Sequence, residues 1–207
     1  MSRPSPRTER LGLLGGTFDP PHIGHVAAAR KCLETLSLDR LLFVVANEPW
    51  QKSPLRRITP AEDRLAMAKA AAGEVPRAEV SRIELDRGGP SYTIETVEKL
   101  REEAELLGSL PPDVFLIVGA DVVAWLPTWH RVDELRGLVT LVVVARPNMP
   151  PSSLVSEWRS VGIEGLDADV SSSQVRDLLE QGASADDLVP ESVRHCILLR
   201  GLYAVRR

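Results

Sequence analysis

Two histidines and two adjacent glycines near the start of the chain belong to a segment whose residue types favour phosphate binding. The segment extends from Gly15 to His25, with the sequence GGTFDPPHIGH, between an apolar stretch and a helical pattern. Glycines let a backbone turn sharply and approach an anion, and a helix start offers unpaired N–H groups at its positive dipole end. His22 and His25 are three residues apart, so both side chains can point toward one ligand. The alternative is an ordinary loop whose histidines cap a helix or face solvent.

A serine cluster near the end of the chain is a second candidate anion site. Ser171, Ser172 and Ser173 immediately precede a helical pattern, and Arg176 follows in its first turns. A single serine there is explained as an N-cap, whose hydroxyl accepts a hydrogen bond from the backbone. The serines together with the arginine also supply hydroxyls, amides and a guanidinium group that can converge on an anion.

The elements that must position these residues alternate along the chain. Apolar, strand-like stretches occur at 11–14, 41–46, 114–118 and 139–145, with helical patterns between them. This alternation predicts an α/β fold with a doubly wound parallel sheet covered on both faces, in one domain with a small helical C-terminal portion. In such sheets, ligands bind beyond the carboxyl ends of strands, where the strand order reverses.

Local signals predict the remaining elements. Thr59-Pro60-Ala61-Glu62 has the pattern of a capping box with proline at the first helical position, which begins a helix that continues to about Ala72. Further expectations are a short strand over 78–84, an amphipathic helix over 94–107, a short helix over 152–160, a helix that ends near Gly182, and a last helix between Pro190 and Gly201.

Length and charge limit the classes of function. A chain of 207 residues suffices for one domain, and its net charge of −4 provides no basic field for nucleic acid or an anionic membrane. Phosphate binding must therefore be local, which favours a small anionic ligand. No stretch reaches membrane-spanning length, and residues 1–10 form a basic leader without an apolar signal core, so the expected domain is 11–207.

Cys32 and Cys196 have no metal-like spacing, which favours a reducing cytoplasm and no disulfide.

The first segment resembles the signature of the nucleotidyltransferase superfamily, G-T-F-D-P followed by H-x-G-H. The serine segment is similar to the I-S-S-T-x-I-R element of the same superfamily. With the matches between them and the Gly201-Leu202-Tyr203 ending, the chain resembles the bacterial nicotinate-nucleotide adenylyltransferases. The resemblance implies a Rossmann-like fold and an enzyme that joins ATP to nicotinate mononucleotide, releasing pyrophosphate.

The same resemblance implies the site residues. The implied catalytic residues are His22, His25 and Arg176. The implied ATP-binding residues are Gly15, Gly16, Thr17, Phe18, Asp121, Ser172, Ser173 and Arg176. The implied residues for nicotinate mononucleotide are Lys52, Thr93, Trp129 and His130. Mg²⁺ would be carried with ATP and bridge its phosphates, with no metal ligands from the protein.

At several of these positions the sequence departs from the family pattern, or a simpler structural role is possible. Lys52 matches the lysine of the family's P-P-H-K, but Trp50-Gln51 replaces the residues before it. Residues 87–96 resemble R-x-x-x-S-Y-T-x-x-T, where Ser91 or Thr93 can also simply cap the following helix. Asp121 in Gly119-Ala120-Asp121 is implied to lie near the ribose, and an ordinary N-cap is the alternative. The resemblance places the Trp129 indole on the pyridine ring, and Arg146-Pro147 on the adenosine side.

The implied chemistry needs no covalent intermediate. The phosphate of the mononucleotide is already a nucleophile, so the enzyme has to bring two anions together in line and neutralise their charge. Rival hypotheses are phosphopantetheine adenylyltransferase, which has threonine where His22 stands, a nicotinamide mononucleotide enzyme, and a nucleotide-sensing module without catalysis. Class I aminoacyl-tRNA synthetases share the H-I-G-H string, but this chain has no K-M-S-K-S-like loop. The sequence leaves the oligomeric state open, a homo-oligomer included.

Overall fold

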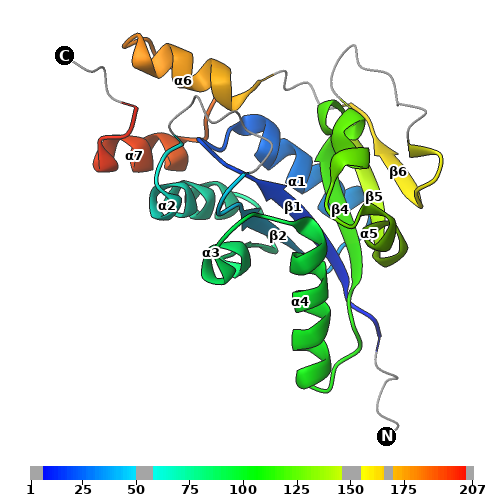
Figure 1. Ribbon diagram of the computed structural model, residues 1–207. Helices are drawn as coiled ribbons and strands as arrows, with labels where there is room; N and C mark the ends of the chain where they lie inside the picture. The colour runs from blue at the N-terminus through cyan, green and yellow to red at the C-terminus, as the bar shows by residue number, and fades with distance from the viewer. Residues whose placement is uncertain (1–6, 50–57, 146–154, 166–169, 204–207) are drawn as a thin grey trace, which may run out of the picture.

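A sheet of six parallel strands in the order β3-β2-β1-β4-β5-β6 forms the centre of the protein (Figure 1). This computed structural model describes residues 7–49, 58–145, 155–165 and 170–203. In chain order the elements are β1 (Arg10–Gly16), α1 (Ile23–Thr35), β2 (Arg40–Val45), α2 (Ala61–Ala72), β3 (Ala78–Ser81), α3 (Ile83–Arg87), α4 (Thr93–Leu106), β4 (Asp113–Gly119), the 3₁₀ helix η1 (Ala120–Thr128), α5 (Val132–Leu138), β5 (Val139–Val144), β6 (Ser160–Ile163), α6 (Ser172–Glu180) and α7 (Glu191–Arg200).

Side chains of the central strands alternate between two hydrophobic cores, one on each face of the sheet. Phe43 and Ile117 pack with apolar residues of α1, α2, α6 and α7. Leu42 and Leu116 pack on the other face with apolar residues of α4, η1 and α5. Because both faces are covered, the strands are continuous apolar runs, as the sequence predicts. The α/β, doubly wound parallel sheet is confirmed.

The strand order reverses between β1 and β4, which lie side by side at the centre of the sheet. After β1 the chain continues toward β2 and β3, whereas after β4 it continues toward β5 and β6. The two neighbouring strands end at Gly16 and Gly119, so their following segments diverge and leave a crevice between them. Helix α6 lies near the start of α1, beyond the end of β1 (Figure 1).

Some predicted elements differ from the structure. The strand expected over 78–84 ends at Ser81, because the Ser81 hydroxyl accepts a hydrogen bond from the Ile83 N–H (3.2 Å) and the short helix α3 begins there. Of the short helix expected over 152–160, residues 152–154 lie outside the described residues, Val155 is in a 3₁₀ helix, and the expected end is wrong because a turn follows and β6 begins at Ser160. As a short edge strand with one fully buried residue, β6 has little of the periodicity that marks a strand.

The capping box expected at the start of α2 is also wrong. Pro60 is the N-cap rather than the first helical residue, and no side chain caps the helix. The Thr59 side chain is hydrogen-bonded to the Tyr203 hydroxyl, and the Thr59 carbonyl accepts a hydrogen bond from Arg64 Nε (2.8 Å). The last helix lies between Pro190 and Gly201 as predicted.

Both cysteines are free thiols, as expected. Cys32 is buried in α1, and this burial raises its pKa to about 12. No helix among the described residues is long and apolar enough to cross a membrane.

Candidate active site

The turn after β1 is formed by Phe18, not by the glycines that the sequence analysis placed in it. Gly15 and Gly16 are the last residues of the strand, and neither has a positive φ. Phe18 has φ 51°, and the Asp19–Pro20 peptide bond that follows is cis. A Cβ on Gly16 would lie 3.0 Å from the Phe18 ring, whereas a Cβ on Gly15 would meet nothing within 4 Å. Gly16 is therefore required because the Phe18 ring packs against its Cα.

The substitution Gly16→Ala is expected to lower the free energy of unfolding by about 1–3 kcal/mol, because the Phe18 ring must move away from the new methyl group. Denaturation in urea measures this change. Gly15→Ala is the matched control, since its methyl group has open space around it in the protein without ligand. Equal stability of the two variants would show that the contact with Phe18 does not constrain Gly16.

The two histidines lie together at the start of α1, as predicted. Their ring centroids are 3.8 Å apart, with His22 buried as the N-cap residue and His25 half-buried in the first turn. The His22 backbone N–H donates to His25 Nδ1 at 3.2 Å. Because Nδ1 of His25 accepts this bond, its neutral ring carries the proton on Nε2, which is then a donor.

The serine segment packs against the turn after β1, which brings the two candidate anion sites together. Ser171 caps α6 by accepting a hydrogen bond from the Gln174 N–H at 3.2 Å. Ser172 Oγ donates to the Pro20 carbonyl at 2.9 Å, across 152 residues of sequence. The capping explanation thus holds for Ser171 alone, and the next serine joins α6 to the first segment.

Arg176 also joins the serine segment to the turn after β1. Its side chain is buried, with Nη1 donating to the Asp19 carbonyl (2.6 Å) and Nη2 donating to Ser173 Oγ (2.8 Å). The guanidinium group therefore keeps the serine segment beside the turn, and its charge lies at the wall of the crevice.

A cavity of about 660 Å³ occupies the crevice between the ends of β1 and β4. All predicted site residues that the structure describes line it: Gly15, Gly16, Thr17, Phe18, His22, His25, Thr93, Asp121, Trp129, His130, Ser172, Ser173 and Arg176. The predicted residue Lys52 lies outside the described residues, as do Trp50-Gln51 and Arg146-Pro147. Among the described residues, no three or more His, Cys, Asp and Glu side chains are grouped so that they could hold a metal ion.

Another part of the cavity wall is formed by aromatic side chains. Trp129 directly follows η1 and is half-buried, and the His130 ring stacks on Tyr92 with 4.4 Å between ring centroids. Tyr92 is the N-cap of α4 without a side-chain cap, so the expected cap by Ser91 or Thr93 is wrong. Ser91 Oγ instead accepts a hydrogen bond from the Asn47 N–H at 2.8 Å, which joins this wall to the end of β2.

Asp121 lies in the first turn of η1 and is exposed to the cavity. The N-cap of η1 is Gly119, so the alternative of Asp121 as an ordinary N-cap is wrong. A Cβ on Gly119 would lie 2.4 Å from Asp121 Oδ1, so a side chain there would displace the carboxylate from its present position. The end of β4 is thus shaped to present an acidic group beside the phosphate-binding segments.

Comparison with known proteins agrees with this arrangement. The family model for cytidylyltransferase-like proteins matches residues 13–178. A probable nicotinate-nucleotide adenylyltransferase of Thermus thermophilus is 42% identical over 195 residues, covering 94% of this chain and 99% of the relative. One of Acidothermus cellulolyticus is 40% identical over 200 residues, covering 95% of each. This chain belongs to the nicotinate-nucleotide adenylyltransferase family.

A solved structure supports the fold of this family member. The nicotinic acid mononucleotide adenylyltransferase of Plasmodium falciparum complexed with NaAD superimposes with a TM-score of 0.76 at 15% identity, covering 94% of this chain and 97% of that chain. At this identity the likeness concerns the fold alone, which is Rossmann-like, as the sequence resemblance implied.

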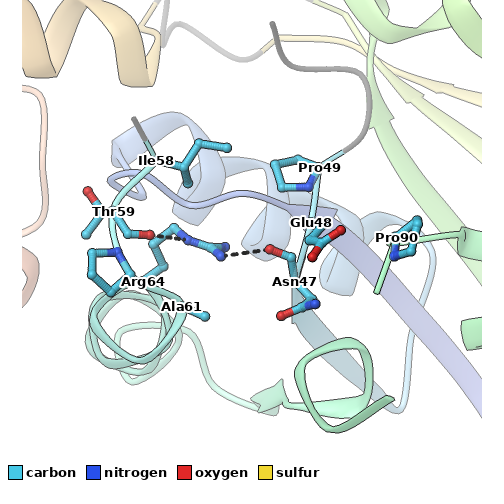
Figure 2. Close-up of a pocket in the computed structure, with 9 residues that line it drawn as sticks. Asn47, Glu48, Pro49, Ile58, Thr59, Ala61, Arg64 and Pro90 are labelled. Carbon is cyan, nitrogen blue, oxygen red and sulfur yellow. Dashed lines mark hydrogen bonds between the residues drawn. The ribbon is translucent and has the colours of Figure 1, made fainter. Parts of the chain in front are cut away.

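Two buried charged residues close to the site could not be predicted from the sequence. Arg64 on α2 is 2% exposed and donates to the carbonyls of Thr59, Thr17, Ala46 and Asn47 at 2.8, 3.1, 2.5 and 3.2 Å. Figure 2 shows its side chain between Thr59 and Asn47, where it lines a smaller cavity of about 410 Å³. Arg64 therefore connects the loop after β1, the loop after β2 and the start of α2. Burial lowers its pKa, and the Asp19 carboxylate raises it.

Glu84 on α3 is the second residue of this kind. It is buried at the cavity wall and accepts a hydrogen bond from Thr96 Oγ1 at 2.8 Å. Burial raises the pKa of Glu84, while hydrogen bonds from Ser91 and Thr96 lower it. No local pattern marks either residue, since a charged residue in a helical segment is usually solvent-exposed.

Proposed function

We propose that this protein transfers the adenylyl group of ATP to nicotinate mononucleotide, giving nicotinate adenine dinucleotide and pyrophosphate. One observation carries the proposal: the α1 and α6 helix starts and an aromatic wall line the same cavity at the strand-order reversal. Helix starts bind phosphates, and a flat aromatic side chain can stack on a pyridine ring. The family relationship supports the same activity.

In the proposed reaction, the mononucleotide phosphate attacks the α-phosphorus of ATP in line, and pyrophosphate leaves. The attacking oxygen needs no further activation, so the protein contributes position and neutralising charge. His25 Nε2 and the adjacent His22 would donate to α-phosphoryl oxygens as their charge grows. Ser172, Ser173 and Arg176 would hold the leaving pyrophosphate from the other side.

The aromatic wall is the proposed place of the nicotinate mononucleotide. Trp129 would stack on the pyridine ring, with His130 beside it, and the α4 start at Thr93 would direct backbone N–H groups at the ring carboxylate. Asp121 would lie near the ribose of ATP, and Lys52 would neutralise the mononucleotide phosphate.

In this proposal magnesium enters as part of the substrate, bound to the phosphates of ATP. Bound there, it would reduce the repulsion between the two anionic substrates. The proposed domain begins with β1, whose first residue is Arg10, one residue before the expected boundary at 11. The proposed location is the cytoplasm, where free thiols such as Cys32 and Cys196 remain reduced.

The test is to measure pyrophosphate release from MgATP with nicotinate mononucleotide, nicotinamide mononucleotide or phosphopantetheine as acceptor. We expect kcat/KM to be at least about tenfold higher for nicotinate mononucleotide, because backbone donors favour its carboxylate over an amide. A preference for nicotinamide mononucleotide or phosphopantetheine would reassign the acceptor. Tight binding of ATP without pyrophosphate release would identify a sensing module instead of an enzyme.

A further inference from the structure

Asp19, in the turn after β1, is fixed by a residue from the far end of the chain. The Tyr203 hydroxyl donates to Asp19 Oδ1 at 2.6 Å, across 184 residues of sequence. The Asp19 backbone carbonyl accepts the bond from Arg176 Nη1 that was described above. Asp19 is 1% exposed, the bond from Arg176 is buried, and the bond from Tyr203 is part-buried. The proposed mechanism uses Arg176 but assigns nothing to Tyr203.

A buried group of charges surrounds this contact. Arg64 and Arg176 are both buried near Asp19: the Arg64 guanidinium interacts electrostatically with the Asp19 carboxylate, and Arg176 donates to the Asp19 backbone carbonyl. Burial raises the pKa of Tyr203, and the Asp19 carboxylate raises it further, so the phenol stays neutral and remains a donor. The net charge of this buried group, formed by Asp19, Arg64, Arg176 and Tyr203, is positive. Positive charge next to the turn favours binding of a polyanion at the turn.

The turn itself needs such support. Phe18, next to Asp19, has a left-handed backbone conformation that is unfavourable for a residue with a Cβ and persists only where its surroundings hold it. The backbone on either side is held by Arg64 at the Thr17 carbonyl (3.1 Å) and by Ser172 at the Pro20 carbonyl (2.9 Å). In the middle of this segment, the Tyr203 hydroxyl holds the Asp19 side chain.

We propose that Tyr203 is a positioning residue for the triphosphate of ATP. By fixing the Asp19 carboxylate, it keeps the segment from Thr17 to His22 in the shape that receives the phosphates. The inference rests on the proposed function in taking this segment as the ATP site. It predicts that loss of the Tyr203 hydroxyl weakens ATP binding selectively, because the wall for the mononucleotide is formed by other elements.

The experiment compares Tyr203→Phe with Leu202→Ala. Tyr203→Phe removes only the hydroxyl and is expected to raise KM for ATP about five- to tenfold, while KM for the mononucleotide changes less than about twofold. Leu202→Ala is the matched control, because Leu202 is half-buried in the core on the α1 side and truncation lowers stability without altering Asp19. Leu202→Ala is expected to lower the thermal midpoint but keep the wild-type KM for ATP.

A second measurement separates positioning from general stability and from the proposed reaction. Calorimetric titration with a non-hydrolysable ATP analogue, without mononucleotide, should show the same weakening in Tyr203→Phe as the kinetics. In Asp19→Ala, which removes the acceptor, adding Tyr203→Phe should weaken binding no further. Wild-type affinity in folded Tyr203→Phe, or independent losses in the double variant, would overturn the inference. If wild-type protein binds the analogue but makes no dinucleotide, the proposed function fails while this comparison still tests Tyr203.

Discussion

Replacing His25 with alanine is expected to lower kcat for dinucleotide formation about 10²–10³-fold, the usual effect of removing one donor from developing transition-state charge. The bond from the His22 backbone N–H to His25 Nδ1 (3.2 Å) fixes the His25 ring and leaves the proton on Nε2. This donor is proposed to act on α-phosphoryl oxygens, whose charge grows during the reaction. The loss should therefore appear mainly in kcat, with a smaller change in KM for ATP.

Steady-state pyrophosphate release measures this effect, with the thermal midpoint as a check of folding. His195→Ala is the matched control, because His195 lies exposed on α7, away from the cavity residues. The control should keep kcat within about twofold of wild type, as expected for a substitution outside the site. Normal turnover in folded His25→Ala would refute the donor role.

The candidate anion sites could be predicted because their signals are local. Histidines three residues apart at a helix start, and serines before another helix start, have consequences that follow from helix geometry alone. That the two segments meet depends on a general rule for doubly wound sheets, which places ligands where the strand order reverses. The contact between Ser172 and Pro20 confirms this meeting, though no sequence pattern fixes its atoms.

The role of the two glycines could not be predicted from the local sequence. Adjacent glycines before a proline are typical of a turn, yet Gly15 and Gly16 complete β1. Gly16 is needed because of the Phe18 ring, and that packing depends on the whole fold. Weak local signals also explain the missed elements α3 and β6, which are short and have few buried residues.

Arg64 is the clearest case of a residue whose role arises only in the folded chain. An arginine in a helical segment is usually solvent-exposed, and nothing adjacent in the sequence marks Arg64 as different. Its hydrogen-bond acceptors come from three separate segments, at Thr17, at Ala46 and Asn47, and at Thr59. These segments meet only after the sheet has formed, so the carbonyl groups and the guanidinium group find each other through tertiary structure.

Arg64→Met is expected to lower the free energy of unfolding by about 3–5 kcal/mol, because methionine fills much of the space but leaves buried carbonyls without their donor. The loops after β1 and β2 would also lose their common anchor, so KM should rise for both substrates. Denaturation in urea measures the stability. Arg64→Lys should recover only part of the loss, since an ammonium group cannot reproduce the planar arrangement of guanidinium donors.

Lys99→Met serves as the control for Arg64→Met, because it removes a cationic side chain from a solvent-exposed position on α4. Lys99 is paired with Glu102 one turn away (2.9 Å), and exposed pairs of this kind contribute little to stability. Its urea midpoint should therefore match that of the wild type. If Arg64→Met unfolded at the same urea concentration as Lys99→Met, the carbonyl contacts of Arg64 would have no net stabilising effect, and the loops would have to be held together by their apolar packing instead.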